Sequence, residues 1–199
     1  MLNEVSKQHR LIGLTGGIAT GKSTVSKYLA EKYHIPVLDA DVFAREAVKP
    51  NSDILKLIFI RYGDQVKLSD GSLDRSALGN IIFNDQEEKQ WLESQIHPYV
   101  RTRFTSELEK ITAETVVLSI PLLFEANLTH LVTEIWVVFC DEATQLERLQ
   151  KRNNLSLAEA QARIKNQLPL TQKIALADVV IDNNQDLTSL YQQCDRNTI

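Results

Sequence analysis

Short apolar runs alternate with amphipathic segments near both ends of the chain. The first run covers residues 11–14, and the segment 23–33 after it repeats its apolar residues at helical spacing. A second run, residues 35–38, follows directly. A strand, a helix and a strand in this order predict a βαβ unit and therefore a parallel sheet.

The middle of the chain, residues 42–112, carries helical spacing without strand patterns. Within it, Asp74 is a predicted N-cap for a helix over residues 75–83, and a later helical pattern is interrupted at His97-Pro98. A connection between neighbouring parallel strands needs only about a dozen residues. The surplus predicts either a lid over a substrate or an inserted helical subdomain.

Strand patterns resume after this insertion, with apolar runs at residues 115–120, 134–140 and 178–181. Together with the first two runs they predict a five-stranded parallel sheet in a three-layer α/β fold. Ser156 and Glu159 have the spacing of a capping box for a late helix. We therefore expect one domain over residues 1–199, with a core at 10–41 and 113–199, the insertion at 42–112 and a short helical lid at about 152–167.

Composition narrows the classes of function. The net charge of −4 provides no basic field for nucleic acid. The two cysteines cannot form a disulfide framework, and Cys140 lies in an apolar run where a buried thiol is expected. No apolar run approaches the ~20 residues of a membrane span, and residues 1–10 lack the apolar centre of a signal peptide. We expect a cytoplasmic protein, monomeric or weakly homo-oligomeric, without nucleic-acid or membrane partners.

A glycine-rich segment follows the first apolar run, in which Gly16 and Gly21-Lys22-Ser23 fit the phosphate-loop pattern G-x-x-x-x-G-K-[ST]. Glycines let successive backbone N–H groups converge on a phosphate, and the helix that follows adds its positive end. Lys22 is then placed to reach the β- and γ-phosphates of a nucleotide, and the Ser23 hydroxyl to bind Mg²⁺. A glycine-rich turn with an incidental Lys-Ser is the alternative.

Two carboxylates, Asp39 and Asp41, stand where the second strand ends, the edge at which open α/β sheets bind ligands. If the segment stays extended, they share a face and Ala40 points away. One carboxylate can accept a proton from an attacking hydroxyl while the other holds Mg²⁺ through water; Asp41, nearer the insertion, is the predicted base. Alternatively, both cap the helix that begins near residue 42.

Arg148 and Arg152 lie four residues apart on one helix face, and Arg163 follows in the next helix. Guanidinium groups match the charge that spreads over the equatorial oxygens in phosphoryl transfer. The alternative is a solvated face on which these arginines pair with Glu147 or Glu159.

Two other groups are weaker candidates. Asp141-Glu142 follows an apolar run and resembles the acidic pair of a motor-type ATPase, but a helix N-cap with a favourable first-turn charge explains it better. His97 stands near Arg101 and Arg103, and a lone histidine is more often a helix-start residue than a catalyst.

With these residues placed, the chain resembles the dephospho-coenzyme A kinase family over almost its whole length. The segments that carry the resemblance are 13–18 with 21–24, Leu38-Asp39-Ala40-Asp41 with Ala44-Arg45-Glu46, Leu73-Asp74-Arg75, Ile96-His97-Pro98, Pro121-Leu122-Leu123-Phe124-Glu125, the Arg148/Arg152 helix, Ala162-Arg163-Ile164 with Gln167, and 177–183.

The resemblance implies transfer of the γ-phosphoryl of ATP to the 3′-hydroxyl of dephospho-CoA, with Mg²⁺. It implies a nucleotide site of Gly17, Ala19, Thr20, Gly21, Lys22, Ser23, Thr24, Arg148 and Asn183, with Ser23 on the metal. It implies an acceptor site of Asp39, Asp41, Arg45, His97, Arg101, Glu125, Arg163 and Gln167, and catalysis by Lys22, Asp41 and Arg152. Ala19 departs from the family's usual glycine and is expected to be tolerable only if its φ is not positive.

Three other kinds of P-loop protein remain as alternatives. A GTPase-like switch lacks support because Asn-Lys-x-Asp and Asp-x-x-Gly motifs are absent. A hydrolytic ATPase that uses Asp141-Glu142 would need no acceptor. Another small-molecule kinase would need a different one.

Overall fold

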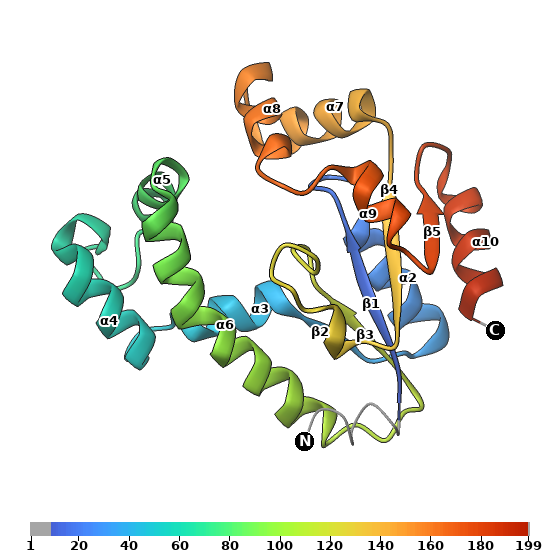
Figure 1. Cartoon of the computed structure of the whole chain (residues 1–199), viewed down its shortest axis with the longest axis horizontal. Coiled ribbons are helices and arrows are strands. Elements are labelled where there is room, and N and C mark those ends of the chain that lie inside the picture. Colours follow the sequence, from blue (N-terminus) through green and yellow to red (C-terminus); the bar gives the residue numbers. More distant parts are fainter. Residues whose placement is uncertain (1–8, 199) are drawn as a thin grey trace. The chain divides into compact units, whose positions relative to one another are not determined.

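The sheet of the computed structural model has five parallel strands in the order β2-β3-β1-β4-β5 (Figure 1). The structure describes residues 9–198, so the polar segment 1–8 and residue 199 lie outside it. The strands are β1 (Arg10–Gly16), β2 (Val37–Asp39), β3 (Thr115–Ser119), β4 (Glu134–Phe139) and β5 (Val179–Asp182). The predicted five-stranded parallel sheet is confirmed.

Apolar residues on both faces bury the central strands, as a parallel sheet covered by helices requires. On one face, Leu14 and Trp136 pack with Val25 of α2 (Lys22–Tyr33) and Leu190 of α10 (Leu187–Thr198), each 0% exposed. The strands β2 and β3 lie on one side of β1 in the sheet, and β4 and β5 lie on the other side. Since β1 is flanked by β3 and β4, its carboxyl end is a switch point, where such sheets bind ligands.

Three helices separate β4 from β5: α7 (Glu142–Asn153), α8 (Leu157–Lys165) and α9 (Leu170–Ala175). The capping box that opens α8 is present, with Ser156 and Glu159 in reciprocal hydrogen bonds. Asp141 takes the N-cap position of α7, although its side chain makes no capping hydrogen bond. The sequence pattern missed α9, a helix of six residues that contacts β4. A 3₁₀ turn, η2 (Thr129–Leu131), precedes β4.

The described chain divides into two compact units, a sheet unit of residues 9–39 with 111–198 and a helical unit of residues 40–110. The helical unit contains α3 (Ala40–Ala47), α4 (Asp53–Tyr62), the 3₁₀ turn η1 (Gly63–Val66), α5 (Arg75–Asn84) and α6 (Gln86–Leu108). Its own apolar core includes Leu55, Ile58 and Leu92. No helix within residues 9–198 is long and apolar enough to span a membrane.

Two predictions about the helical unit are wrong. The interruption at His97-Pro98 does not occur, because α6 continues through Pro98. Proline removes one backbone donor, but burial of Leu92, Val100 and Phe104 holds the helix on both sides of it.

The N-cap at Asp74 is confirmed, since its carboxylate accepts from the backbone amides of Ser76 and Ala77.

The second correction concerns Asp41. The expectation of an extended segment through Asp39-Ala40-Asp41 is wrong, because β2 ends at Asp39 and α3 begins at Ala40. Asp41 therefore lies in the first turn of α3, where the helix dipole favours a negative charge. The two carboxylates do not share a face by strand alternation.

Candidate functional site

The glycine-rich loop lies between the end of β1 and the start of α2, at the carboxyl edge of the sheet (Figure 1). Gly21 precedes the first helical residue with φ of 103°, a conformation that side chains disfavour. A Cβ atom there would lie 2.1 Å from Asn183 Nδ2. Glycine is therefore required at this position by both backbone conformation and space.

Three side chains donate hydrogen bonds to backbone carbonyl groups of the loop. The Thr20 hydroxyl donates to the Gly17 carbonyl at 2.9 Å, and Gln145 Nε2 donates to the Ile18 carbonyl at 2.7 Å. Asn183 Nδ2 donates to the Thr20 carbonyl at 2.8 Å. With its carbonyl oxygens engaged in this way, the loop leads into the free N–H groups at the start of α2, an arrangement suited to an anion.

Ala19 adopts the left-handed conformation, with φ of 63°. The sequence had predicted that alanine is tolerable here only without a positive φ, and the structure contradicts that condition. An L-residue in this region costs about 1–2 kcal/mol. The loop's hydrogen bonds to buried side chains compensate for that strain, so the substitution for glycine is a strained one and not a neutral variation.

Lys22 extends from the first turn of α2 toward the ends of two neighbouring strands. Its Nζ donates to the Ser119 hydroxyl at 2.5 Å, and that hydroxyl donates to Asp39 Oδ2 at 2.8 Å. The Lys22 ammonium lies 3.9 Å from the same carboxylate oxygen. The structure thus brings together two predicted residues, Lys22 and Asp39, and adds Ser119, a buried residue that no motif indicated.

A cavity of about 450 Å³ opens beside the loop in the sheet unit. It is lined by Ala19, Gly21, Ser23, Thr24, Arg148, Arg152, Asn183, Gln185, Asp186 and Leu187. The sequence predicted the first seven of these as nucleotide-site or catalytic residues and missed the last three, Gln185 and Asp186 in the connection after β5 and Leu187 at the start of α10. One cavity of this size beside a phosphate loop suits a nucleotide.

Arg148 presents an unsatisfied donor in this region. Its Nη2 donates to the Asn183 carbonyl at 3.1 Å, whereas its Nη1 is buried and has no hydrogen-bond partner within the described chain. Arg152 is exposed and donates from Nε to the Asn153 side chain at 2.9 Å. No ion pair joins either arginine to Glu147 or Glu159 among residues 9–198, contrary to the alternative of a paired solvated face. A buried guanidinium N–H without a partner favours a ligand with acceptor atoms.

Three other predicted residues lie on or near α8 and the turn after β3. Gln167 Oε1 accepts from the backbone N–H of Ile18 at 2.7 Å, so this side chain holds the loop. Glu125 accepts from Lys173 Nζ at 2.8 Å and from the backbone N–H of Leu168 at 2.9 Å. Arg163 is exposed on α8 and lines neither of the two cavities described here. Substrate binding by these residues stays a prediction.

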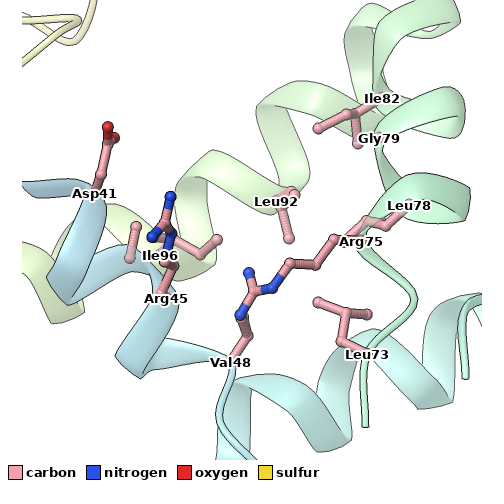
Figure 2. Close-up of a pocket in the computed structure, with 11 residues that line it drawn as sticks. Asp41, Arg45, Val48, Leu73, Arg75, Leu78, Gly79, Ile82, Leu92 and Ile96 are labelled. Atoms are coloured by element: carbon pink, nitrogen blue, oxygen red, sulfur yellow. The ribbon is translucent and has the colours of Figure 1, made fainter. Parts of the chain in front are cut away.

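The helical unit has a cavity of its own, of about 400 Å³. It is lined by Asp41, Ala44, Arg45, Val48, Leu73, Arg75, Leu78, Gly79, Ile82, Leu92 and Ile96. Figure 2 shows the Arg75 side chain reaching from the start of α5 toward α3, which carries Arg45 and leads into Val48, and passing between Leu92 of α6 and Leu73. Within residues 9–198 neither guanidinium forms an ion pair, whereas Arg103 pairs with both Glu46 and Glu107. Two unpaired cations over an apolar floor suit a ligand that is both anionic and partly apolar.

His97 and Arg101 lie on α6 and line neither cavity. The pKa of His97 is lowered, chiefly because partial burial disfavours the charged imidazolium; Glu93 opposes this shift, and Arg101 supports it with a smaller effect. His97 is therefore held toward its neutral form, which can donate from one ring nitrogen and accept at the other.

The sequence model of the family described as "CoaE: Dephospho-CoA kinase" matches residues 10–189. The chain is similar to a dephospho-CoA kinase of Synechocystis sp., with 60% identity over 94% of this chain and 93% of the relative. The chain belongs to the dephospho-CoA kinase family.

Solved structures agree with this membership in the dephospho-CoA kinase family. A protein of Thermus thermophilus is 32% identical, with a TM-score of 0.85 and 96% of each chain covered. A dephospho-CoA kinase from Campylobacter jejuni is 28% identical, with a TM-score of 0.70 and 96% of each chain covered. The resemblance predicted from the sequence is confirmed, and membership makes the chain an ATP-dependent kinase.

Proposed function

We propose that the chain transfers the γ-phosphoryl group of ATP to the 3′-hydroxyl of dephospho-CoA, the last step in the synthesis of coenzyme A. The observation that carries the proposal is a phosphate loop with its carbonyls held from behind, in a member of the dephospho-CoA kinase family. The phosphates of ATP would meet the loop and the Lys22 ammonium, and Arg152 would neutralise charge on the transferring group. The unsatisfied Nη1 of Arg148 would donate to the nucleotide.

Mg²⁺ would be held at the Ser23 hydroxyl together with phosphate oxygens of ATP. The donor set fits this ion, because Mg²⁺ in kinases keeps several waters and uses few protein ligands besides substrate phosphates. Ser23 is exposed beside the loop, and no group of three or more His, Cys, Asp or Glu suited to a metal occurs in residues 9–198. Asp39 would contribute through water. The metal supplies neutralisation of the β- and γ-phosphate charge.

Dephospho-CoA would bind the helical unit through its cavity. Its diphosphate would meet Arg45 and Arg75, and its less polar parts would cover the apolar floor. Arg101, His97, Arg163, Gln167 and Glu125 are further proposed contacts of the acceptor. The two guanidinium groups without ion pairs support this assignment, because each guanidinium can donate two parallel hydrogen bonds to the oxygens of a phosphate.

Asp41 would act as the general base for the 3′-hydroxyl. It lines the same cavity as Arg45 and Arg75, which is the cavity assigned to the acceptor. Asp39, in contrast, accepts a hydrogen bond from the Ser119 hydroxyl, which itself accepts one from Lys22 Nζ. The first position suits a group that takes a proton from the acceptor, and the second suits a group that orders the metal and phosphates.

We also propose a lid over residues 152–167, a cytoplasmic location in which ATP is available, and action as a monomer or weak homo-oligomer on small molecules alone. The lid would exclude water from the transferring phosphoryl group. Hydrogen exchange with and without a non-hydrolysable ATP analogue tests it. Equal protection of residues 152–167 in both states would contradict a lid.

One assay tests the reaction itself. The protein is incubated with ATP and Mg²⁺, with and without dephospho-CoA, and ADP release is followed while the product is examined by ³¹P NMR for a new 3′-phosphate. We expect ADP only when the acceptor is present. Acceptor-independent ADP release would favour a hydrolytic ATPase, and a preference for GTP would favour a switch.

The structure gives the hydrolytic alternative no specific support. Asp141 and Glu142 are exposed, and neither lines the cavity beside the loop. Asp141 receives no capping bond, but its position immediately before α7 is that of an N-cap. An acidic pair that activates water would have to reach the γ-phosphate.

A further inference from the structure

Lys173 is the only charged residue among residues 9–198 that is fully removed from solvent, with 0% exposed. It lies on α9, a helix that carries no recognised motif and contacts β4. Taking an ammonium group out of water is costly unless a counter-charge and hydrogen bonds replace the lost hydration. A lysine is therefore retained here against a physical penalty, which calls for a reason beyond packing.

The contacts of Lys173 supply one acceptor for each of its three N–H donors. Its Nζ lies 2.8 Å from Glu125 Oε1, 3.3 Å from the Pro121 carbonyl and 3.4 Å from the Gly16 carbonyl. Gly16 is the first glycine of the phosphate-loop pattern. The ammonium therefore holds the carbonyl at the point where β1 passes into the loop, a carbonyl that the other loop-holding side chains do not reach.

Glu125 links this contact to a second one on the same loop. Its Oε1 accepts both from Lys173 and from the backbone N–H of Leu168 at 2.9 Å. The residue before Leu168 is Gln167, whose side chain accepts from the Ile18 N–H at 2.7 Å. The ion pair therefore connects with the loop directly at Gly16 and, through one peptide unit, at Ile18.

We propose that Lys173 and Glu125 form a positioning pair that fixes the phosphate loop in its nucleotide-binding conformation. Lys173 orients the Gly16 carbonyl, and Glu125 anchors the peptide that places Gln167 against Ile18. Neither residue is required to touch the phosphates. Loss of the pair lets the loop sample conformations in which its N–H groups no longer converge, and the nucleotide must then order the loop on binding.

Stability alone does not account for the pair. Buried ion pairs contribute little net stability and are often replaced by apolar groups without loss, whereas removal of one partner leaves an uncompensated charge. This difference separates positioning from stability by experiment. The inference rests on the proposed function only in taking ATP and ADP as the nucleotides, and it is tested by binding, not by turnover.

Three variants provide the test: Lys173→Met, Glu125→Gln and the double variant Lys173→Met/Glu125→Gln. Each is measured for melting temperature and for ADP affinity by calorimetry. We expect Lys173→Met to melt at lower temperature and to bind ADP about tenfold more weakly, equivalent to one charge-assisted hydrogen bond. Glu125→Gln keeps an oxygen acceptor for Lys173 and the Leu168 N–H, so a loss of about twofold to threefold is expected.

The double variant decides between the two roles. It removes the carboxylate that Lys173→Met leaves without a counter-charge; since the Glu125 side chain is 21% exposed and therefore partly solvated, the melting temperature is expected to recover part of the loss. Its ADP affinity is expected to stay about tenfold low, because the Gly16 carbonyl still lacks its donor. Recovery of ADP affinity together with melting temperature would overturn the proposal, as would wild-type affinity in Lys173→Met.

Hydrogen exchange in the absence of nucleotide supplies a second measurement. Faster exchange at residues 16–18 is expected in the double variant and not in Lys32→Met, a matched control that breaks a 2.9 Å pair with Asp195 away from the loop. Unchanged exchange at residues 16–18 in the double variant would also overturn the proposal. If the wild-type protein binds ADP but fails to phosphorylate dephospho-CoA, the proposed function is wrong and this inference still stands or falls on the same binding data.

Discussion

Four buried side chains hold the carbonyl groups of the phosphate loop, whereas two exposed arginines without ion-pair partners in the described chain stand over an apolar floor in the helical unit. Thr20, Gln145, Asn183 and Lys173 make up the first set, each less than 9% exposed. Arg45 and Arg75 make up the second. In the phosphate loop, hydrogen bonds within the protein order the polar atoms. In the helical cavity, the two guanidinium groups remain available to bind a ligand.

The difference corresponds to two ways of recognising phosphate groups. A site ordered in advance stabilises developing charge without reorganising at the moment of reaction, which is what a transferring phosphoryl group needs. Exposed long side chains must be ordered when the ligand arrives, which weakens binding but accommodates a flexible molecule. The comparison predicts that changes at the loop act on nucleotide binding and on the rate, and that changes in the helical cavity act on acceptor binding.

The largest effect is expected from Lys22→Ala. Removing one preorganised charge that meets the phosphates should lower kcat by about 10²–10³-fold, or about 3–4 kcal/mol of transition-state stabilisation. The fold should be retained, because Lys22 lies at a loop–helix junction and contributes little to the core. Steady-state kinetics with a circular-dichroism melt checks both statements. Lys27→Ala, on the exposed side of α2, is the control, and a folded Lys22→Ala protein with normal turnover would contradict the assignment.

Asp41→Asn should lower kcat by about 10²-fold while ATP·Mg²⁺ still binds, since loss of a general base costs about 10²–10⁴-fold. Asp39→Asn should instead raise the Mg²⁺ concentration needed for half-maximal rate, because Asp39 lies in the hydrogen-bonded group with Ser119 and Lys22. Two activity titrations and one ATP-binding titration separate the roles. Near-normal turnover of Asp41→Asn would mean that another group, or none, takes the proton.

Arg45→Ala and Arg75→Ala should each raise the KM for dephospho-CoA by about tenfold and leave the KM for ATP unchanged, since a hydrogen bond to a charged group is worth about 1.5–3 kcal/mol. Arg101→Ala, which lies outside the cavity, should raise the same KM by a smaller factor. Arg61→Ala is the control, because Arg61 is paired with Glu88 at 2.6 Å. An increase in the KM for ATP alone would assign the wrong ligand to the helical unit.

The smallest effect is expected from Ala19→Gly. Glycine relieves the left-handed strain of about 1–2 kcal/mol but increases the entropy lost on folding by about 0.5–1 kcal/mol, for a net gain of about 0.5–1 kcal/mol. Urea denaturation of Ala19→Gly and of the wild type measures this difference in the free energy of unfolding. Gly21→Ala serves as the opposite case, since its Cβ would lie 2.1 Å from Asn183 Nδ2. If Ala19→Gly is no more stable than wild type, Ala19 is not strained in the folded protein.

Runs of apolar residues were the most informative pattern, most clearly for the central strands β1, β3 and β4, which are largely buried. Such runs located all five strands to within two residues at either end, because strands of a parallel sheet tend to be continuous apolar runs, including the short β2 and β5. Sequence periodicity missed α9, whose six residues span less than two turns and leave no period to detect. It also broke α6 at Pro98, because tertiary burial on both sides outweighs the lost hydrogen bond.

By itself, the sequence determined the phosphate loop, the positions of the strands along the chain, and membership of the dephospho-CoA kinase family, because these depend on the chemistry of contiguous residues at fixed spacing. Only the tertiary structure showed that Lys22 donates a hydrogen bond to Ser119 and that Ala19 has a positive φ. It also showed that Lys173 donates to the Gly16 carbonyl, 157 residues away in the sequence. Such contacts join segments that no local pattern relates, and they exist only after the sheet has brought the strand ends together.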